Sequence, residues 1–222
     1  MNVNILVVGI GGQGVMTAAE VLARSALAAG WDACKTEIAG MSQRGGVVSS
    51  HVRIASHVHA SEIMPGQVDL LLAMEMAEGL RWGHWLAPAG RAIVSTLRAV
   101  PPVVSSGRAT YPEDPFGDLL ALGHEAWMVN AAGIAATIGD ARAANSVLLG
   151  AASDFLPLAS DDMRGQLLLR FRGNDMLTRS NKEAYEAGRA WMRAARPGRA
   201  GLLATGDVNA DAAPFGARER CG

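Results

Sequence analysis

Short apolar runs alternate along the chain with segments of helical periodicity. The first run, Ile5 to Val8, is four consecutive apolar residues, three of them β-branched. Such a run predicts a fully buried strand of the kind found in parallel sheets. One apolar helix face follows it, made by Val15, Ala18, Ala19, Leu22 and Ala26. Gly30 is placed to end that helix in a left-handed cap, so the chain begins as strand, turn and helix.

The same alternation continues over most of the sequence. Further strands are predicted at 31–38, 47–54, 68–73, 92–94 and 127–129, and helices at 76–86, 142–156, 161–171 and 181–193. Strands that alternate with helices predict the α/β class, here a Rossmann-like open, mostly parallel sheet with helices on both faces. We expect one such domain over residues 1–195. Residues 196–222 are rich in Gly, Ala, Pro and Asp without periodicity, which predicts a disordered tail.

A glycine cluster lies between the first predicted strand and the first predicted helix. Gly9, Gly11 and Gly14 match the G-x-G-x-x-G spacing of dinucleotide-binding loops. Backbone N–H groups at such a helix start suit an anion such as a phosphate. Alternatively, the glycines serve only to let the helix pack closely on the strand. The motif alone does not distinguish anion binding from close packing. Glu37 falls where dinucleotide-binding folds place a ribose-binding carboxylate, although a polar residue at a strand end is an equally good interpretation.

A second glycine-rich loop, residues 40–46, contains Arg44 followed by Gly45 and Gly46. Its guanidinium could bind a carboxylate or phosphate through two parallel hydrogen bonds, or could lie in solvent. Both loops follow strands that we predict to be parallel, so both should emerge at the carboxyl edge of the sheet, where open α/β sheets bind ligands. The candidate ligand-binding residues are therefore Gly11, Gly12, Gln13, Gly14, Arg44, Gly45 and Gly46.

Three other places carry polar groups with more than one interpretation. His51, His57 and His59 lack a clear companion carboxylate or thiol, so the sequence does not favour a zinc site. Glu75 ends a predicted strand and could contact a ligand, but an acid at a helix start is the interpretation we favour. The small-residue helix that contains Asn145 suits a subunit contact, with packing against the sheet as the alternative.

Composition limits the classes of function. Of the 222 residues, 50% are hydrophobic and the net charge is −1, so no general attraction to nucleic acid is indicated. No apolar run approaches the roughly 20 residues of a membrane span, and we expect a cytoplasmic protein. The two cysteines, Cys34 and Cys221, provide neither a disulfide framework nor a C-x-x-C motif. They are also too few to hold a cubane iron–sulfur cluster.

Several motifs in one order give the chain a family resemblance. Residues 9–14, 36–46 and 50–53 resemble the gamma module of 2-oxoacid:ferredoxin oxidoreductases, most closely the small (beta) subunit in the indolepyruvate branch. Residues 69–75 and 142–150 agree with it, and the similarity extends over roughly residues 3–194. Two glycine loops in the right order make this resemblance more specific than a single glycine fingerprint.

The resemblance implies a division of labour between subunits. Thiamine diphosphate, magnesium and the iron–sulfur clusters would belong to a large partner subunit, which would pass electrons to ferredoxin and the acyl group to coenzyme A. This chain would bind no cofactor alone and carry no catalytic residue, while coenzyme A could lie at the subunit interface. Two alternatives remain: a free-standing NAD(P)-dependent dehydrogenase, which the glycine loop and Glu37 favour, and a purely structural Rossmann-like scaffold. Gln13, an unusual side chain in such a loop, and the absence of a hydride-transfer constellation in the sequence argue against the dehydrogenase.

Overall fold

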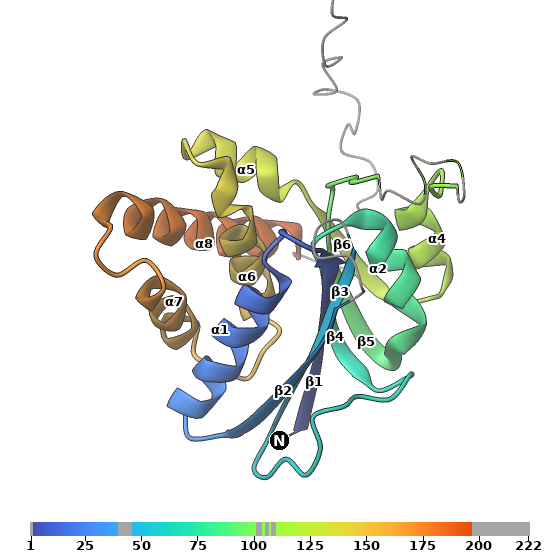
Figure 1. The fold of residues 1–222 in the computed structure, drawn as a ribbon, viewed down its shortest axis with the longest axis horizontal. Coiled ribbons are helices and arrows are strands. Elements are labelled where there is room, and N and C mark those ends of the chain that lie inside the picture. Colours follow the sequence, from blue (N-terminus) through green and yellow to red (C-terminus); the bar gives the residue numbers. More distant parts are fainter. Residues whose placement is uncertain (1, 40–45, 101–103, 105–106, 108–109, 197–222) are drawn as a thin grey trace, which may run out of the picture.

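The computed structural model describes residues 2–39, 46–100, 104, 107 and 110–196 and contains one six-stranded sheet (Figure 1). The strand order is β2-β3-β1-β4-β5-β6. The strands are β1 (Asn2–Ile10), β2 (Asp32–Ala39), β3 (Val47–Ala55), β4 (Val68–Ala73), β5 (Leu86–Ser95) and β6 (Glu125–Val129). Strands β1, β4, β5 and β6 pair in parallel, whereas β3 pairs antiparallel with β1 on one side and β2 on the other.

The position of β3 corrects one expectation. We predicted that both glycine loops follow parallel strands, but β2 and β3 form an antiparallel hairpin joined by residues 40–46. The hairpin inserts β3 between β1 and β2, and two antiparallel pairings in succession leave β1 and β2 running in the same direction. The carboxyl ends of β1 and β2 therefore still lie at one edge of the sheet, although the strands are not neighbours.

Helices cover both faces of the sheet, which confirms the predicted fold class. Figure 1 shows α2 (Met76–Trp82) and α4 (Pro115–Ala121) on one face and all the other α-helices on the opposite face. The larger group consists of α1 (Val15–Ala28), α5 (Ala131–Thr137), α6 (Ala144–Ser153), α7 (Ser160–Leu169) and α8 (Asp175–Ala195). Two 3₁₀ turns, η1 (Gly83–Trp85) and η2 (Ala141–Ala143), adjoin α2 and α6. No helix in the described part of the chain has both the length and the apolarity to span a membrane.

Burial on both faces explains the continuous apolar run of β1. Ile5 and Val7 point into the core beneath α1 and α6, while Leu6 and Val8 point into the core beneath α2 and α4. All four side chains are inaccessible to solvent. A strand that is covered on both sides has no polar face, and this is why its sequence shows no alternation.

Helices α6 and α8 pack with almost no side chain between their backbones. A Cβ atom built on Gly188 would lie 2.0 Å from the carbonyl oxygen of Val147, and one built on Gly150 would lie 2.0 Å from that of Tyr185. All residues of α6 from Ser146 to Ser153 are buried within the chain. The prediction that this small-residue helix contributes to a subunit contact is therefore wrong for that stretch, and the alternative of internal packing holds.

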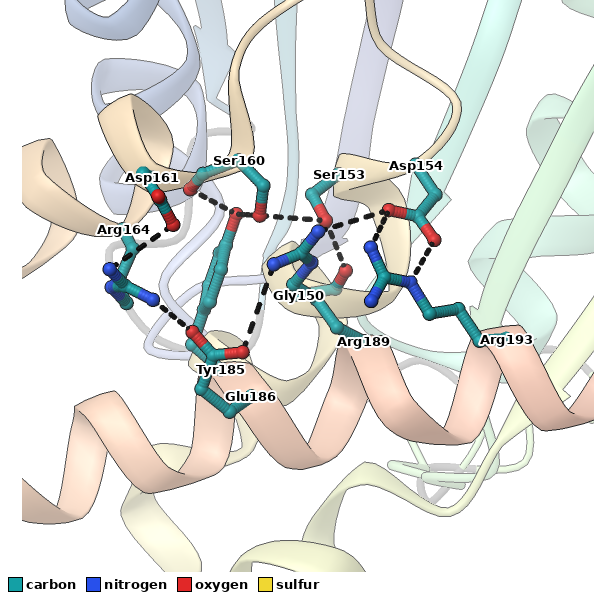
Figure 2. A network of polar contacts seen from close by, with 10 residues as sticks. All are labelled: Gly150, Ser153, Asp154, Ser160, Asp161, Arg164, Tyr185, Glu186, Arg189 and Arg193. Atoms are coloured by element: carbon teal, nitrogen blue, oxygen red, sulfur yellow. Dashed lines mark hydrogen bonds and ion pairs between the residues drawn. The ribbon is translucent and has the colours of Figure 1, made fainter.

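Polar contacts fix α8 to α7 and to the end of α6 (Figure 2). The hydroxyl of Tyr185 lies 2.9 Å from Ser160 Oγ and donates to the Ser160 carbonyl oxygen at 3.0 Å. Arg193 Nε donates to Asp154 Oδ2 at 2.9 Å, one turn after Gly150. α8 begins earlier than we predicted, at Asp175, because the Asn174 side chain accepts from Leu177 N and caps it. These contacts set the position of α6, whose first turn reaches the edge where the glycine loop lies.

The predicted tail, residues 196–222, lies outside the described residues except for Arg196.

Candidate functional site

The carboxyl edge of the sheet has a topological switch point between β1 and β4. After β1 the chain crosses through α1 on one face to reach β2, whereas after β4 it crosses through α2 on the other face to reach β5. Open α/β sheets bind their ligands outside the carboxyl ends of the strands at such a switch point. The residues at the switch point of this sheet are the first glycine loop and the start of α2.

The first glycine loop is held by the side chain of Gln13. Its Oε1 accepts from Ile10 N at 2.8 Å, and Gln13 N donates to Ile10 O at 3.1 Å. The side chain lies so close over Gly9 that a Cβ there would be 2.7 Å from Gln13 Oε1. Gln13 therefore shapes the loop from within. Gly12 and Gly14 adopt φ values of 101° and 84°, which glycine tolerates best.

Contacts from two directions converge on this loop. Gly11 N donates to Gly46 O at 2.8 Å, which brings the end of the second loop against the first, at the edge where we expected both loops to emerge. Asn145 Nδ2, from α6, donates to Gly14 O at 2.9 Å and leaves no room for a side chain at Gly14. Asn145 Oδ1 is buried and has no hydrogen-bond partner within the described residues. Because glycine caps α1, the cap residue offers no side chain to the first N–H groups of that helix.

Arg44 and Gly45 lie outside the described residues, so their part in the site remains a prediction.

Glu75 is a buried acid at the start of α2, and it holds several segments together. Its Oε2 accepts from Glu78 N at 2.9 Å, so the predicted role at a helix start is confirmed. Its Oε1 accepts from Ala99 N at 3.2 Å and from the hydroxyl of Tyr111. Burial, and then the hydrogen bond to Glu75, raise the pKa of Tyr111 to about 12. The sequence gave no signal for this contact, because Tyr111 lies in a proline-rich segment without periodicity.

A cavity of about 310 Å³ opens beside this cluster, between α2 and α4. Met76, Phe116, Leu120 and Met128 give it an apolar lining, and Thr96 and Arg98 contribute polar atoms. Arg98 Nη2 is held by the carbonyl oxygens of Pro112 and Glu113 at 3.0 and 3.2 Å, and its guanidinium stacks over the Tyr111 ring at 4.8 Å. Arg98 thus joins the first residues after β5 to Pro112 and Glu113, just before α4.

The polar residues of β3 serve the connection from β3 to β4. His51 Nδ1 accepts from Ile63 N at 3.0 Å, and Arg53 Nη1 donates to Ala60 O at 3.1 Å. His51 is completely buried, and that burial lowers its pKa. Within the described residues no three His, Cys, Asp or Glu side chains are grouped as metal ligands would be, so His57 and His59 have no third ligand there.

Glu37 does not occupy the position of a ribose-binding carboxylate. β3 separates its strand from β1, and its carboxylate forms an ion pair with Lys35 at 2.6 Å. In a dinucleotide-binding fold the corresponding strand lies next to β1. The geometry therefore removes one of the two features that favoured a dehydrogenase.

Comparisons with known proteins place these features in a family. A family profile described as "Pyruvate ferredoxin/flavodoxin oxidoreductase" matches residues 4–191. Indolepyruvate oxidoreductase subunit IorB of Archaeoglobus fulgidus is 41% identical over 152 residues, which cover 68% of this chain and 75% of that protein. IorB of Thermococcus kodakarensis is 36% identical over 174 residues, which cover 72% of this chain and 82% of that protein.

Solved structures share the fold. The gamma subunit of a keto/oxoacid ferredoxin oxidoreductase from Geobacter sulfurreducens matches with a TM-score of 0.62 and 22% identity, covering 86% of this chain and 99% of that one. A 2-oxoglutarate:ferredoxin oxidoreductase from Magnetococcus marinus, with 2-oxoglutarate, coenzyme A and succinyl-CoA bound, matches with a TM-score of 0.68 and 19% identity. That match covers 87% of this chain and 31% of the longer chain.

Proposed function

The chain belongs to the pyruvate ferredoxin/flavodoxin oxidoreductase family, and we propose that it is the small, non-catalytic subunit of an indolepyruvate-type 2-oxoacid:ferredoxin oxidoreductase. The observation that carries this proposal is the 41% identity to three quarters of a curated IorB subunit. The assembled enzyme would decarboxylate an aryl 2-oxo acid oxidatively, form its acyl-CoA and pass the electrons to ferredoxin.

The donor groups of this chain do not fit the redox centres of such an enzyme. A cubane cluster takes about four cysteine thiolates, and the whole sequence contains two cysteines. We therefore assign the iron–sulfur clusters to a large partner subunit, together with thiamine diphosphate and its magnesium ion. The isolated chain is expected to be inactive.

The carboxyl edge is our candidate for the surface that this chain contributes to the complex. The start of α1 has no side-chain cap, the first loop is braced by Gly46 and Asn145, and Arg44 lies two residues before Gly46 in the sequence. Backbone N–H groups at a helix start and a guanidinium both favour an anion. The anion would be a phosphate of coenzyme A or a carboxylate of the large subunit.

The substitution Arg44→Ala tests this surface in the co-expressed complex. Loss of a phosphate contact would raise the KM for coenzyme A, whereas loss of a subunit contact would lower the yield of the co-purified large subunit. Arg179→Ala is the matched control, because Arg179 is exposed on α8 and pairs only with Glu183 within the described residues. An Arg44→Ala complex that assembles normally and keeps the wild-type KM would refute both versions.

A dehydrogenase would have to bind a nicotinamide cofactor. We expect no binding of NAD⁺, NADH, NADP⁺ or NADPH in calorimetric titrations, since Glu37 is paired with Lys35 and β3 occupies the position next to β1. Micromolar binding of any of the four would overturn the assignment.

A further inference from the structure

Strand β2 is a long edge of the sheet. Its eight residues pair with β3 without a break, from Asp32 opposite Ala55 to Ala39 opposite Val48. Its other side pairs with no strand in the described part of the chain. Such an edge offers a row of N–H and C=O groups to another strand, and proteins usually obstruct it with proline, a bulge or a charged side chain. β2 contains neither a proline nor a bulge.

The one lysine of β2 is neutralised within the chain. Lys35 Nζ lies 2.6 Å from Glu37 Oε1 and 3.1 Å from Glu20 Oε2, and all three side chains lie on the α1 face of the sheet. A lysine that is already paired with two carboxylates repels an approaching strand only weakly. The opposite face of β2 carries Ile38, which is 51% exposed, and the free thiol residue Cys34.

We propose that β2 pairs with β2 of a second copy of this chain, antiparallel about a two-fold axis through Thr36. In an antiparallel pair, residues that lie opposite each other point to the same face of the sheet. An axis between two neighbouring residues would place residues of different faces opposite each other, so the axis must pass through a residue. Two registers use seven residues of the strand, one centred on Lys35 and one on Thr36. The first places the two lysines opposite each other. The register centred on Thr36 places Lys35 of each copy across from Glu37 of the other copy. This pair forms twice, and a lysine facing a glutamate across two strands is stabilising.

The same register joins the remaining side chains favourably. Thr36 meets its own copy, and threonine pairs are among the favourable cross-strand pairs. Ile38 meets Cys34 of the second copy on the face opposite α1. A two-fold contact of this kind closes on itself and gives a dimer. Because one strand pair buries less than the about 1,600 Å² of a standard interface, we expect micromolar affinity. The proposal depends on the geometry of β2 and stands apart from the assignment of function.

A cysteine introduced at Ile38 tests the register. In the full chain carrying Cys221→Ser, Ile38→Cys would place each new thiol opposite Cys34 of the other copy, within reach of a disulfide. Mild oxidation should give a covalent dimer on a non-reducing gel. The control protein also carries Cys34→Ser, so that the cysteine at position 38 faces a serine of the other copy. It should form no covalent dimer. Equal cross-linking in both proteins, or none in either, would overturn the proposed register.

Sedimentation equilibrium of the full chain tests the dimer itself. The wild type should show a monomer–dimer equilibrium, and Glu37→Lys should raise its dissociation constant about tenfold by placing like charges opposite each other at two positions. Glu183→Lys is the matched control, since Glu183 forms a comparable surface pair with Arg179 far from β2 in the sequence, and it should leave the constant unchanged. A wild type that stays monomeric at 200 µM (roughly two hundred times a dissociation constant of about 1 µM) would refute the dimer. If the wild type stays monomeric and Glu37→Lys lowers the amount of large subunit that co-purifies with this chain, the edge of β2 binds the large subunit instead.

Discussion

The contact between α6 and α8 allows a sharp prediction about stability. Gly188→Ala adds one methyl group at a point where a Cβ would lie 2.0 Å from Val147 O, 2.8 Å from Val147 C and 3.0 Å from Val147 Cα. All three are backbone atoms, so no side chain can rotate away. An ordinary contact needs at least 3.4 Å, and the helices would have to part by more than about 1 Å.

The size of the effect follows from two opposing contributions. Alanine in a helix interior is intrinsically favoured over glycine by about 1 kcal/mol. Overpacking costs about 1–3 kcal/mol where side chains can adjust, and more where the backbone must move along a helix that is buried from Ser146 to Ser153. We expect a net loss of about 2–3 kcal/mol in the free energy of unfolding, which lowers Tm by about 5–10 °C.

Thermal and urea unfolding of the purified chain measure this loss. Gly165→Ala is the matched control, because Gly165 lies within α7 and a Cβ there would meet no atom within 4 Å. That variant should be unchanged or stabilised by up to about 1 kcal/mol. Gly150→Ala should resemble Gly188→Ala, and the double variant should lose less than the sum, since one separation of the helices relieves both clashes. A Gly188→Ala protein as stable as Gly165→Ala would refute the proposed close packing.

Two further predictions concern the edge of the sheet and the buried tyrosines. Asn145→Ala removes the hydrogen bond to Gly14 O, so we expect a loss of about 0.5–1.5 kcal/mol in urea unfolding, and unchanged stability would contradict the bracing role of Asn145. Burial raises the pKa of Tyr111, to about 12, and of Tyr185, and these are the two tyrosines of the chain. Since the folded pKa exceeds the unfolded value of about 10, the stability that these tyrosines contribute is present below pH 10 and is lost above it, in the case of Tyr111 as the pH rises towards 12. An ultraviolet titration should find most of the tyrosine protonated at pH 10 in the folded protein, and half ionisation there would contradict it.

The hydrophobic pattern of the sequence predicted where the strands lie better than whether neighbouring strands run parallel or antiparallel. Period and apolar runs identify β2 and β3 as strands, but they carry no information on whether two strands run in parallel. The antiparallel insertion of β3 follows from the short connection of residues 40–46, which cannot contain a crossover helix. The length of this connection was the signal in the sequence for an antiparallel pair. The same pairing places β3 between β1 and β2, and so excludes Glu37 from the ribose-binding position.

The sequence predicted where the two glycine loops emerge, while their binding of a ligand stays a prediction. Glycines before a helix pointed to the carboxyl edge, and the hydrogen bond from Gly11 N to Gly46 O agrees with the expectation that both loops emerge there. The inward turn of Gln13 and the bond of Tyr111 to Glu75 join residues through tertiary contacts, which local periodicity does not encode. The same holds for Gly150 and Gly188, whose role depends on the helix that faces each of them.

The central proposal, that this chain completes a 2-oxoacid:ferredoxin oxidoreductase, is tested most directly by reconstitution. The large subunit, prepared under anaerobic conditions with thiamine diphosphate and magnesium, is assayed for ferredoxin reduction with indolepyruvate and coenzyme A, with and without this chain. We expect neither subunit to be active alone, and reduction that depends on coenzyme A when the two are combined. Full activity of the large subunit without this chain, or no activity of the assembled complex with any aryl 2-oxo acid, would contradict the account.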